Sequence, residues 1–174
     1  MSMTYEELDQ RTREFMLSEF ETEQTDPERY FSRAMSTAGL AAFPDLMRDA
    51  IRSGNEVSLI ESLHRPEFWK PRDAGSKTVN LDHASTRLGL SEFSTWYVRG
   101  LGRRLMEEGV TNCQVYRGAE PKRAPASCSQ HEGQTMPVSV VYEGHRARYW
   151  PEPDPSAFSI PYEPGCHHVV RRVT

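Results

Sequence analysis

The sequence lacks long hydrophobic runs. None of its segments approaches the roughly 20 consecutive apolar residues that a membrane-spanning helix requires, and the mean hydropathy of the 174 residues is −0.69. The N-terminus also lacks the basic residues followed by an apolar stretch that mark a secretory signal. We therefore expect a soluble protein that is made inside a cell and does not contact membranes.

Cysteine is also scarce. The three cysteines, Cys113, Cys128 and Cys166, are odd in number and too few for a disulfide framework. Their scarcity favours a reducing compartment, where a cysteine more often binds a metal or packs in the core. At 19.9 kDa, the chain has the size of one ordinary domain with an appendage.

A surplus of basic residues is missing as well. The chain carries 21 Lys and Arg against 25 Asp and Glu, and residues 1–29 hold nine of these acids against three arginines. Because a nucleic-acid-binding protein usually concentrates basic residues on one face, we do not expect specific nucleic-acid binding. The acidic segment is either a solvated helix face or an arm that docks on a basic partner.

Residues 1–65 predict a string of helices. Thr4 and Glu7 have the three-residue spacing of a capping box at the start of the first helix. Pro27 follows an aspartate and is typical of the first position of a helix, which predicts the start of a second helix there. Pro44 is read in the same way, as the start of a third helix. Gly54 closes the third helix, and a short apolar stretch after it predicts a fourth. This part of the chain is therefore expected to be an acidic, all-helical region.

Residues 66–79 interrupt the helical pattern with two prolines and a glycine, which predicts a linker. The aromatic residues Phe68 and Trp69 indicate that part of this linker packs on the rest of the protein. Residues 80–174 then form the second predicted region.

The second region opens with helices. A helix is expected near residues 80–89, and Ser91 is a suitable cap for a second helix, the longest in the protein, which ends at Gly109. Gly100 and Gly102 lie inside this helix, where each glycine costs roughly 1 kcal/mol relative to alanine. We therefore expect these two glycines to allow close packing against a neighbouring element.

After Gly109 the pattern changes to short extended runs rich in Val and Tyr. Strands are predicted at residues 112–117, 138–142, 147–150 and 168–173, in a small and mostly antiparallel sheet. The five prolines among residues 151–164 exclude a helix or a central strand there and predict a loop. The sequence thus predicts an α+β fold with N-terminal helices, a long central helix and a small C-terminal sheet.

Cysteine and histidine are concentrated in this last part of the chain. Cys128 is followed by His131, and Cys166 is followed by His168. Thiolate and imidazole together favour zinc, which is held by four such ligands and adds its binding energy to folding. We therefore predict a structural zinc site with Cys128, His131, Cys166 and His168 as ligands. The alternative is ordinary buried thiols and hydrogen-bonded histidines, and Cys113 is read as a core residue.

The patterns typical of catalysis are weaker. No glycine-rich phosphate loop follows a predicted strand, and the Pro-Cys-x-x-Cys of zinc deaminases is absent. A nucleophilic pair of Cys166 and His168 is possible in principle, but only Glu163 is near enough in sequence to orient it. We therefore predict that the protein is not an enzyme and has no catalytic residues.

The second region resembles the C-terminal domain of phage head morphogenesis proteins of the Mu F type, which are minor capsid proteins. The resemblance covers roughly residues 80–172. It rests on short motifs in the same order: Ser91-Glu92-Phe93, Tyr97-Val98-Arg99-Gly100, Glu108-Gly109-Val110, Val115-Tyr116-Arg117, Cys128-Ser-Gln-His-Glu-Gly133, Ile160-Pro161 and Pro164-Gly-Cys-His-His168.

The match to the family's cysteine motifs is partial. Cys128 falls on the second cysteine of the family's Cys-x-x-Cys, and Pro125 stands where the first would be. In the closing motif, Glu163 stands in place of the family's histidine, Cys166 matches the penultimate cysteine, and His168 replaces the last one. If a metal binds here, these departures imply that the fourth ligand is His131, Glu163, Cys113 or a water molecule.

The resemblance implies a virion component that works through assembly contacts. Its expected partners are other virion proteins of the portal, capsid or neck, in a multi-copy assembly, and its expected location is the virion, or the host cytoplasm during assembly. The main alternative is a zinc-dependent hydrolase or nuclease that uses the Cys/His cluster with an open coordination position. A third possibility is a regulatory module whose acidic N-terminal segment binds a basic partner.

Overall fold

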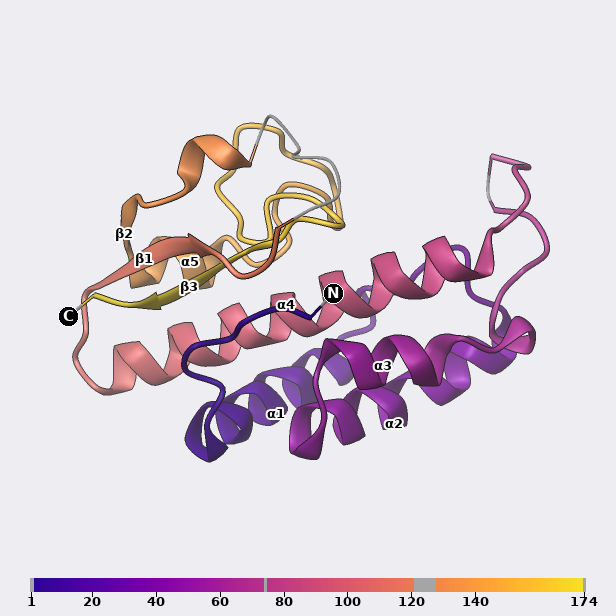
Figure 1. Cartoon of the computed structure of the whole chain (residues 1–174), viewed down its shortest axis with the longest axis horizontal. Helices are drawn as coiled ribbons and strands as arrows, with labels where there is room; N and C mark the ends of the chain where they lie inside the picture. Colours follow the sequence, from indigo (N-terminus) through magenta and orange to yellow (C-terminus); the bar gives the residue numbers. More distant parts are fainter. Residues whose placement is uncertain (1, 74, 121–127, 174) are drawn as a thin grey trace.

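The computed structural model of the protein describes residues 2–73, 75–120 and 128–173. Helix α4 (Leu81–Glu107) runs through the middle of the molecule, with three helices on one side and a small sheet on the other (Figure 1). The predicted α+β class, with N-terminal helices, a long central helix and a small antiparallel C-terminal sheet, is confirmed.

Helix α1 (Gln10–Gln24) begins later than predicted, because the side chain of Asp9, and not that of Thr4, caps it by accepting a hydrogen bond from the backbone of Thr12. It packs closely on α4 at Gly100. A Cβ atom at Gly100 would lie 2.6 Å from the backbone nitrogen of Met16, so only glycine allows this approach. The close packing predicted for Gly100 is therefore confirmed. The same prediction for Gly102 is wrong, because a Cβ atom there would lie 3.4 Å from its nearest neighbour, Cβ of Tyr142, which is an ordinary contact distance.

Helix α2 (Thr37–Ser53) begins after Ser36, whose side chain caps it, and ends at Gly54 as predicted. The predicted helix starts at Pro27 and Pro44 are wrong. Pro44 lies inside α2, and the chain after Pro27 forms turns. Tertiary contacts explain this difference, because Met35 pairs with Trp69 in an antiparallel bridge and the aromatic rings of this segment pack against residues 149–150.

Helix α3 (Glu56–Leu63) is the predicted short helix, and Asn55 begins it with a capping box. The predicted linker follows, starting with the 3-10 helix η1 (Pro66–Phe68). Part of this segment is packed down, as expected from its aromatic residues. Trp69 is buried and donates a hydrogen bond from its indole nitrogen to the carbonyl of Leu63.

Two helices were expected around residues 80–107, but α4 is continuous across Gly89 and Ser91. Gly89 lies where α4 meets α3: a Cβ atom there would approach Ile60 to 2.6 Å. Its role is therefore close packing rather than helix termination. Gly109, with φ of +74°, follows the end of α4 as predicted. Among the described residues, no helix combines the length and the apolar character needed to cross a bilayer.

The sheet contains β1 (Asn112–Arg117), β2 (Thr135–Pro137) and β3 (His168–Arg172) in the order β2-β1-β3, with both pairings antiparallel. The predictions for β1 and β3 are confirmed. The predicted strand at 138–142 is wrong, because these residues form helix α5 (Val138–Glu143), which packs on α4.

The remaining predictions for this region have mixed outcomes. Residues 147–150 do not form the predicted strand. Successive turns at residues 144–150 are closed by backbone hydrogen bonds, and they place the hydroxyl of Tyr149 against Thr95 of α4. The proline-rich segment 151–164 contains neither helix nor strand, as predicted.

Candidate metal centre

Three of the four predicted metal ligands meet inside the protein. Cys128 immediately precedes the 3-10 helix η2 (Ser129–His131), Cys166 follows the turn at Gly165, and His168 is the first residue of β3. The ligand atoms of Cys128, Cys166 and His168 all lie within 4.8 Å of one another. The two cysteines are completely buried and His168 is 2% exposed. The fold therefore encloses two sulfur donors and one nitrogen donor in a single site.

The imidazole of His168 is held from both sides. Its Nδ1 lies 3.6 Å from Sγ of Cys166, and its Nε2 lies 3.3 Å from a carboxylate oxygen of Glu132. Arg117 donates two hydrogen bonds, of 2.6 and 2.9 Å, to the same oxygen of Glu132. The hydrogen bonds from Arg117 lower the pKa of Glu132, although burial opposes this shift. A charged Glu132 favours the tautomer in which Nε2 carries the proton, so that Nδ1 is free to bind a metal.

The loop before β3 is positioned by contacts with two other elements. Gly165 has φ of +93°, a conformation that favours glycine, and its backbone nitrogen donates a hydrogen bond to the Ser91 hydroxyl of α4. Gly118, just after β1, donates from its backbone to the carbonyl of His167. The turn that carries Cys166 is therefore held between α4 and the sheet by contacts that do not involve the cluster itself.

Burial controls the protonation of the cysteines. It raises the pKa of the Cys166 thiol to about 12 and also raises the pKa of Cys128. Without a bound cation, both thiols are therefore protonated at neutral pH, and metal binding would displace their protons. Cys113 lies apart in β1, where burial raises its pKa to about 11. Its predicted role as a core residue is consistent with its complete burial.

His131 lies outside the cluster. Its ring packs against the rings of Phe158 and Tyr162, at centroid distances of 5.3 and 4.9 Å, and its Nδ1 lies 3.3 Å from the side-chain oxygen of Gln134. Within the described residues, no fourth His, Cys, Asp or Glu joins Cys128, Cys166 and His168. His131 is therefore a ring-packing residue, whereas its neighbour Glu132 lies behind His168.

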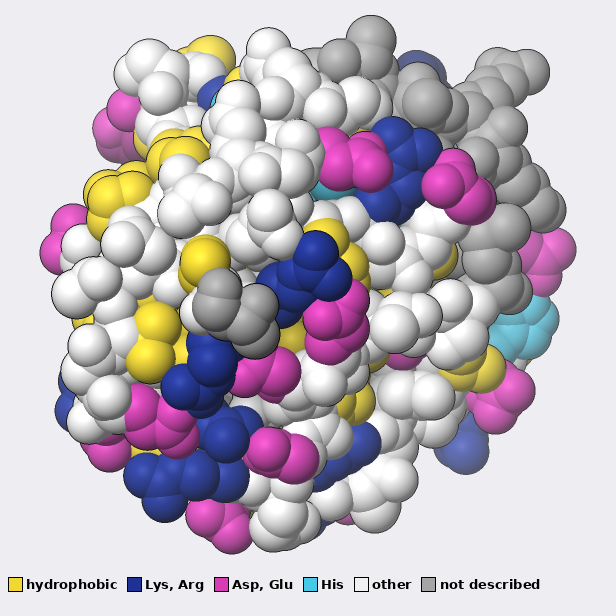
Figure 2. All heavy atoms as spheres, turned by 60° about the vertical axis from the view of Figure 1, so that its left-hand side comes forward, with side chains coloured by type: hydrophobic (Ala, Val, Ile, Leu, Met, Phe, Trp, Pro, Cys, Tyr) yellow, Lys and Arg dark blue, Asp and Glu magenta, His cyan; other side chains and the backbone are white. Residues whose placement is uncertain are grey.

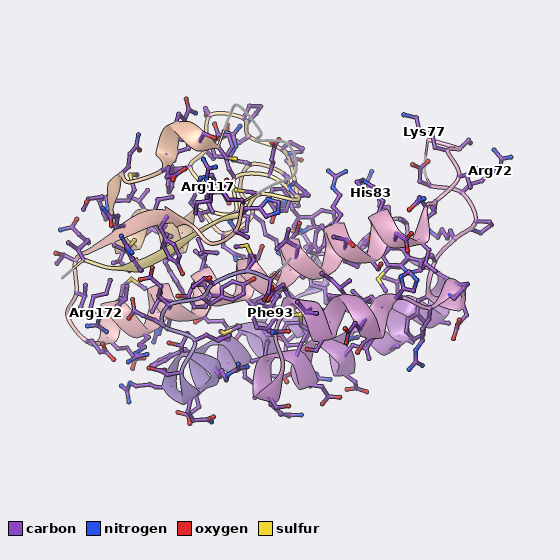
Figure 3. The ribbon with its side chains drawn as sticks, viewed as in Figure 1. Arg72, Lys77, His83, Phe93, Arg117 and Arg172 are labelled. Carbon is purple, nitrogen blue, oxygen red and sulfur yellow. The ribbon has the colours of Figure 1, made fainter. Side chains whose placement is uncertain are left out.

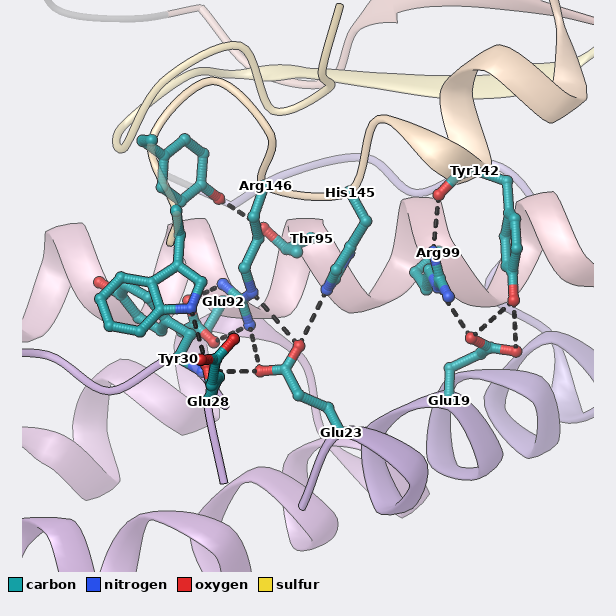
Figure 4. Close-up of polar contacts among 12 residues, drawn as sticks. Glu19, Glu23, Glu28, Tyr30, Glu92, Thr95, Arg99, Tyr142, His145 and Arg146 are labelled. Atoms are coloured by element: carbon teal, nitrogen blue, oxygen red, sulfur yellow. Dashed lines mark hydrogen bonds and ion pairs between the residues drawn. The ribbon is translucent and has the colours of Figure 1, made fainter. Parts of the chain in front are cut away.

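A second group of buried polar residues was not anticipated. Arg146 forms two hydrogen bonds, of 2.7 and 2.9 Å, with the carboxylate of Glu92 on α4, and both side chains are almost completely buried (Figure 4). Glu23 of α1 contacts Arg146 and lies 3.0 Å from Nε2 of His145. Burial would raise the pKa of Glu23, but the hydrogen bond from His145 and the charge of Arg146 outweigh it and hold the pKa at about 2. These contacts join α1, α4 and the segment after α5.

The acidic N-terminal segment serves mainly as a set of internal counter-charges. Figure 2 shows one face on which arginines and acidic side chains lie side by side. Six of the nine acids pair with basic residues of the same chain: Glu6 with Arg171, Glu7 with Arg172, Asp9 with Arg104, Glu19 with Arg99, Glu21 with Arg48, and Glu23 with His145 and Arg146. The reading of this segment as an arm for a basic partner therefore loses its main argument.

The fold and the site define an α+β protein with a buried Cys-Cys-His cluster. Comparison of the chain with protein-family models, curated proteins and solved structures finds no match. The resemblance to Mu F-type proteins therefore stays a prediction that rests on the motifs themselves.

Proposed function

We propose that the protein is a structural component of a tailed-phage or prophage head that acts through contacts with portal, capsid or neck proteins and catalyses no reaction. In this proposal, zinc bound by Cys128, Cys166 and His168 stabilises the C-terminal layer. The observation that carries the proposal is the meeting of these three residues, from two distant segments, in the protein interior. The virion, and the host cytoplasm during assembly, are the corresponding locations.

The chemistry of the donors fits zinc. Two thiolates and one imidazole are typical ligands of structural zinc, and a carboxylate behind the histidine is a common supporting contact. Glu132 occupies this supporting position. Arg117, which Figure 3 labels in the C-terminal layer, holds it there by hydrogen bonds. When bound, zinc would supply a cross-link between the loop at Cys128 and the start of β3.

The sequence resemblance supports the same conclusion independently. Cys128 and Cys166 stand at cysteine positions of the Mu F-type motifs, and His168 stands at another. Because the cluster is almost fully buried, its role is better explained by stabilisation than by turnover.

The proposal is tested by combining metal analysis with particle composition. We expect elemental analysis of the purified protein to find one zinc per chain, and mass spectrometry of purified phage particles to find the protein among their components. Protein that contains no zinc when purified from zinc-supplemented cells would contradict the metal site. Absence of the chain from purified particles of the phage that encodes it would contradict the assembly role.

One observation favours a zinc-dependent hydrolase or nuclease as a second candidate. The described residues provide three ligands, and the residues outside the described ranges, 1, 74, 121–127 and 174, include no Cys, His, Asp or Glu. Three protein ligands with one open position are typical of catalytic zinc. This candidate predicts zinc-dependent cleavage of a phosphodiester or ester substrate, whereas the structural role predicts no turnover with either.

A further inference from the structure

Two adjoining hollows lie on the surface formed by residues 29–33, the first turns of α2 and the loop at residues 70–73. Their volumes are about 270 and 320 Å³, and Phe31, Ser32 and Leu40 line both of them. The residues of the metal cluster line neither hollow, so this surface is separate from the candidate metal centre. We define the α2 surface by six of the lining residues: Phe31, Leu40, Phe43, Arg33, Lys70 and Arg72.

Large apolar side chains of the α2 surface are exposed to solvent. Four large hydrophobic residues are exposed in the described part of the chain, and two of them, Phe31 at 47% and Leu40 at 37%, lie together here. The ring of Phe31 is held in place by Trp150 at a centroid distance of 5.8 Å, and Trp150 donates a hydrogen bond to the carbonyl of Glu28. Single exposed apolar residues are ordinary, but an exposed pair beside a hollow is typical of a protein-binding surface.

The first hollow is mainly apolar. Met35, Phe43 and Leu88 line it together with the exposed pair, and Arg29 lies at it without any carboxylate among the described lining residues. A cavity of about 150 Å³ is already large enough for a benzene molecule. The volume of about 270 Å³ therefore leaves room for one aromatic or aliphatic side chain of a partner.

The second hollow carries an excess of positive charge. Arg33, Lys70 and Arg72 line it against a single carboxylate, that of Asp73. This carboxylate already accepts two hydrogen bonds of 2.9 Å from backbone N–H groups of its own loop. Within the described ranges, none of the three basic side chains forms an ion pair, and Lys70 and Arg72 donate to backbone carbonyls instead. Figure 3 shows Arg72 on the loop before α4, pointing away from the helices.

This arrangement differs from the rest of the surface, where most arginines meet an acid of the same chain. The acids of the N-terminal segment are mostly used in internal pairs, whereas the bases of the α2 surface have no such counter-charge. An acidic partner would supply it. A nucleic acid suits the surface less well, because the whole chain has a net charge of −4 and its walls at Met35 and Leu40 are aliphatic.

We propose that the α2 surface docks an acidic segment of another protein. One large apolar side chain of this segment enters the first hollow beside Phe31 and Leu40, and neighbouring carboxylates pair with Arg33, Lys70 and Arg72 at the second. The apolar contact supplies most of the affinity, and the charges select an acidic partner. This docking surface goes beyond the role proposed for the metal cluster and does not depend on it.

Titration of the isotope-labelled full-length protein, followed by NMR, tests the proposal because it detects weak binding and locates it. The probe is the acetylated and amidated peptide Glu-Asp-Leu-Glu-Asp-Phe-Glu-Asp. We expect saturable shifts that concentrate at the α2 surface and weaken when salt is added. Two matched peptides should bind several times more weakly: one with serine in place of Leu and Phe, and one with glutamine and asparagine in place of the acids.

The variant Arg33→Glu tests the basic hollow. Arg33 is exposed, so the protein should fold with an unchanged melting temperature, and we expect the affinity for the peptide to fall about threefold or more. Arg52→Glu is the matched control. Arg52 is an exposed arginine of α2 that lines neither hollow, so reversing its charge should leave the affinity close to that of the wild type.

The variant Leu40→Ala tests the apolar part of the surface. Removing this exposed side chain should weaken peptide binding by about threefold or more, because less apolar area is buried against the partner. Val140→Ala is the matched control, since Val140 has a similar exposed fraction of 38% but lies on α5, away from both hollows. It should bind the peptide as the wild type does.

Four results would overturn the proposal. The first is the absence of saturable shifts at the α2 surface, and the second is binding by Arg33→Glu and Leu40→Ala as tight as that of their controls. The third is tighter binding of an oligothymidylate than of the peptide at the same residues, which would identify a nucleic-acid surface. The fourth is the appearance of the same shifts when the protein alone is concentrated, which would identify a second copy as the occupant.

Discussion

The helical layer and the sheet layer cover opposite sides of α4, and their interiors differ in composition. The helical layer is filled by large apolar side chains, among them Met16, Phe20, Met47, Ile51 and Leu63. The strands of the sheet layer have three, five and six residues, and their buried residues are three valines with one cysteine, one tyrosine and one histidine. Short strands with small side chains bury little apolar surface, so this layer needs other contacts to hold it.

Two kinds of polar contact provide this additional stability. The pair of Arg146 and Glu92, with Glu23 and His145, ties the segment after α5 to α4 and α1 (Figure 4). The cluster of Cys128, Cys166 and His168 ties β3 to the loop before β2. A thin core can thus be compensated by directed polar contacts, and in our proposal the contacts at Cys128, Cys166 and His168 depend on a bound metal.

The largest effect is expected from Arg146→Ala. This change leaves the buried carboxylate of Glu92 without its partner, and breaking such a pair costs about 3–5 kcal/mol. Urea unfolding monitored by circular dichroism measures this loss. Arg103→Ala is the control, because Arg103 forms an exposed i,i+4 pair that contributes at most about 0.5 kcal/mol. Equal losses in the two variants would show that the buried pair does not hold the sheet layer.

A smaller effect is expected in the apolar contact of the helical layer. Gly100→Ala forces a Cβ atom against the backbone of Met16 and should destabilise the protein by about 1–3 kcal/mol. Gly102→Ala is a matched control in the same helix. A Cβ atom at Gly102 would lie 3.4 Å from its nearest neighbour, Cβ of Tyr142, which is an ordinary contact distance. Because alanine also has the higher helix propensity, this change should be neutral or should stabilise the protein by up to about 1 kcal/mol. Similar thermal unfolding of both variants would contradict the close packing of α1 on α4.

The remaining expected effect is a change of stability with pH, which is spread over several pH units. Burial lowers the pKa of His145 from 6.5 to about 4, and the contacts of Glu23 hold its pKa at about 2 instead of 4.5. Both groups bind fewer protons in the folded protein than in the unfolded chain. Their contribution is therefore complete above pH 6.5 and decreases as the pH falls towards 2, by up to roughly 3 kcal/mol for each group.

Urea unfolding between pH 7.5 and 2.5 measures this dependence. In His145→Gln, the decrease between pH 6.5 and 4 should disappear, while the decrease below pH 4.5 that belongs to Glu23 should become smaller but persist, because the charge of Arg146 still lowers the pKa of Glu23. Stability that stays constant in the wild type from pH 7 to 4 would show that His145 is not held as the structure indicates.

The features that could be predicted from sequence are those that depend on local contacts. Gly109 follows the end of α4 with a positive φ that favours glycine, and Gly54 follows the end of α2. Strands β1 and β3 follow from residues with high β-propensity, such as Val115, Val169 and Val170. The continuity of α4 through Gly89 could not be predicted, because it depends on a close contact with Ile60 of another helix. The same holds for residues 138–142, whose valines suit a strand but pack as a helix on α4.

The candidate site shows the same division. Ligand type identified Cys128, Cys166 and His168, because cysteine and histidine are uncommon and chemically distinct. His131 has the same residue type, but aromatic packing holds it outside the cluster. Glu132 could not be singled out, because glutamate is common in this sequence and only the fold brings it to His168.

The most direct test of the account is the stability of Cys166→Ser compared with the wild type, with zinc and with a chelator. We predict that zinc raises the melting temperature of the wild type, that the variant loses several kcal/mol of stability relative to it, and that the chelator removes most of the difference. Cys113→Ser is the control, since Cys113 lies outside the cluster, and its response to zinc should match that of the wild type. A wild-type melting temperature that is the same with zinc and with chelator would contradict the proposed zinc cross-link.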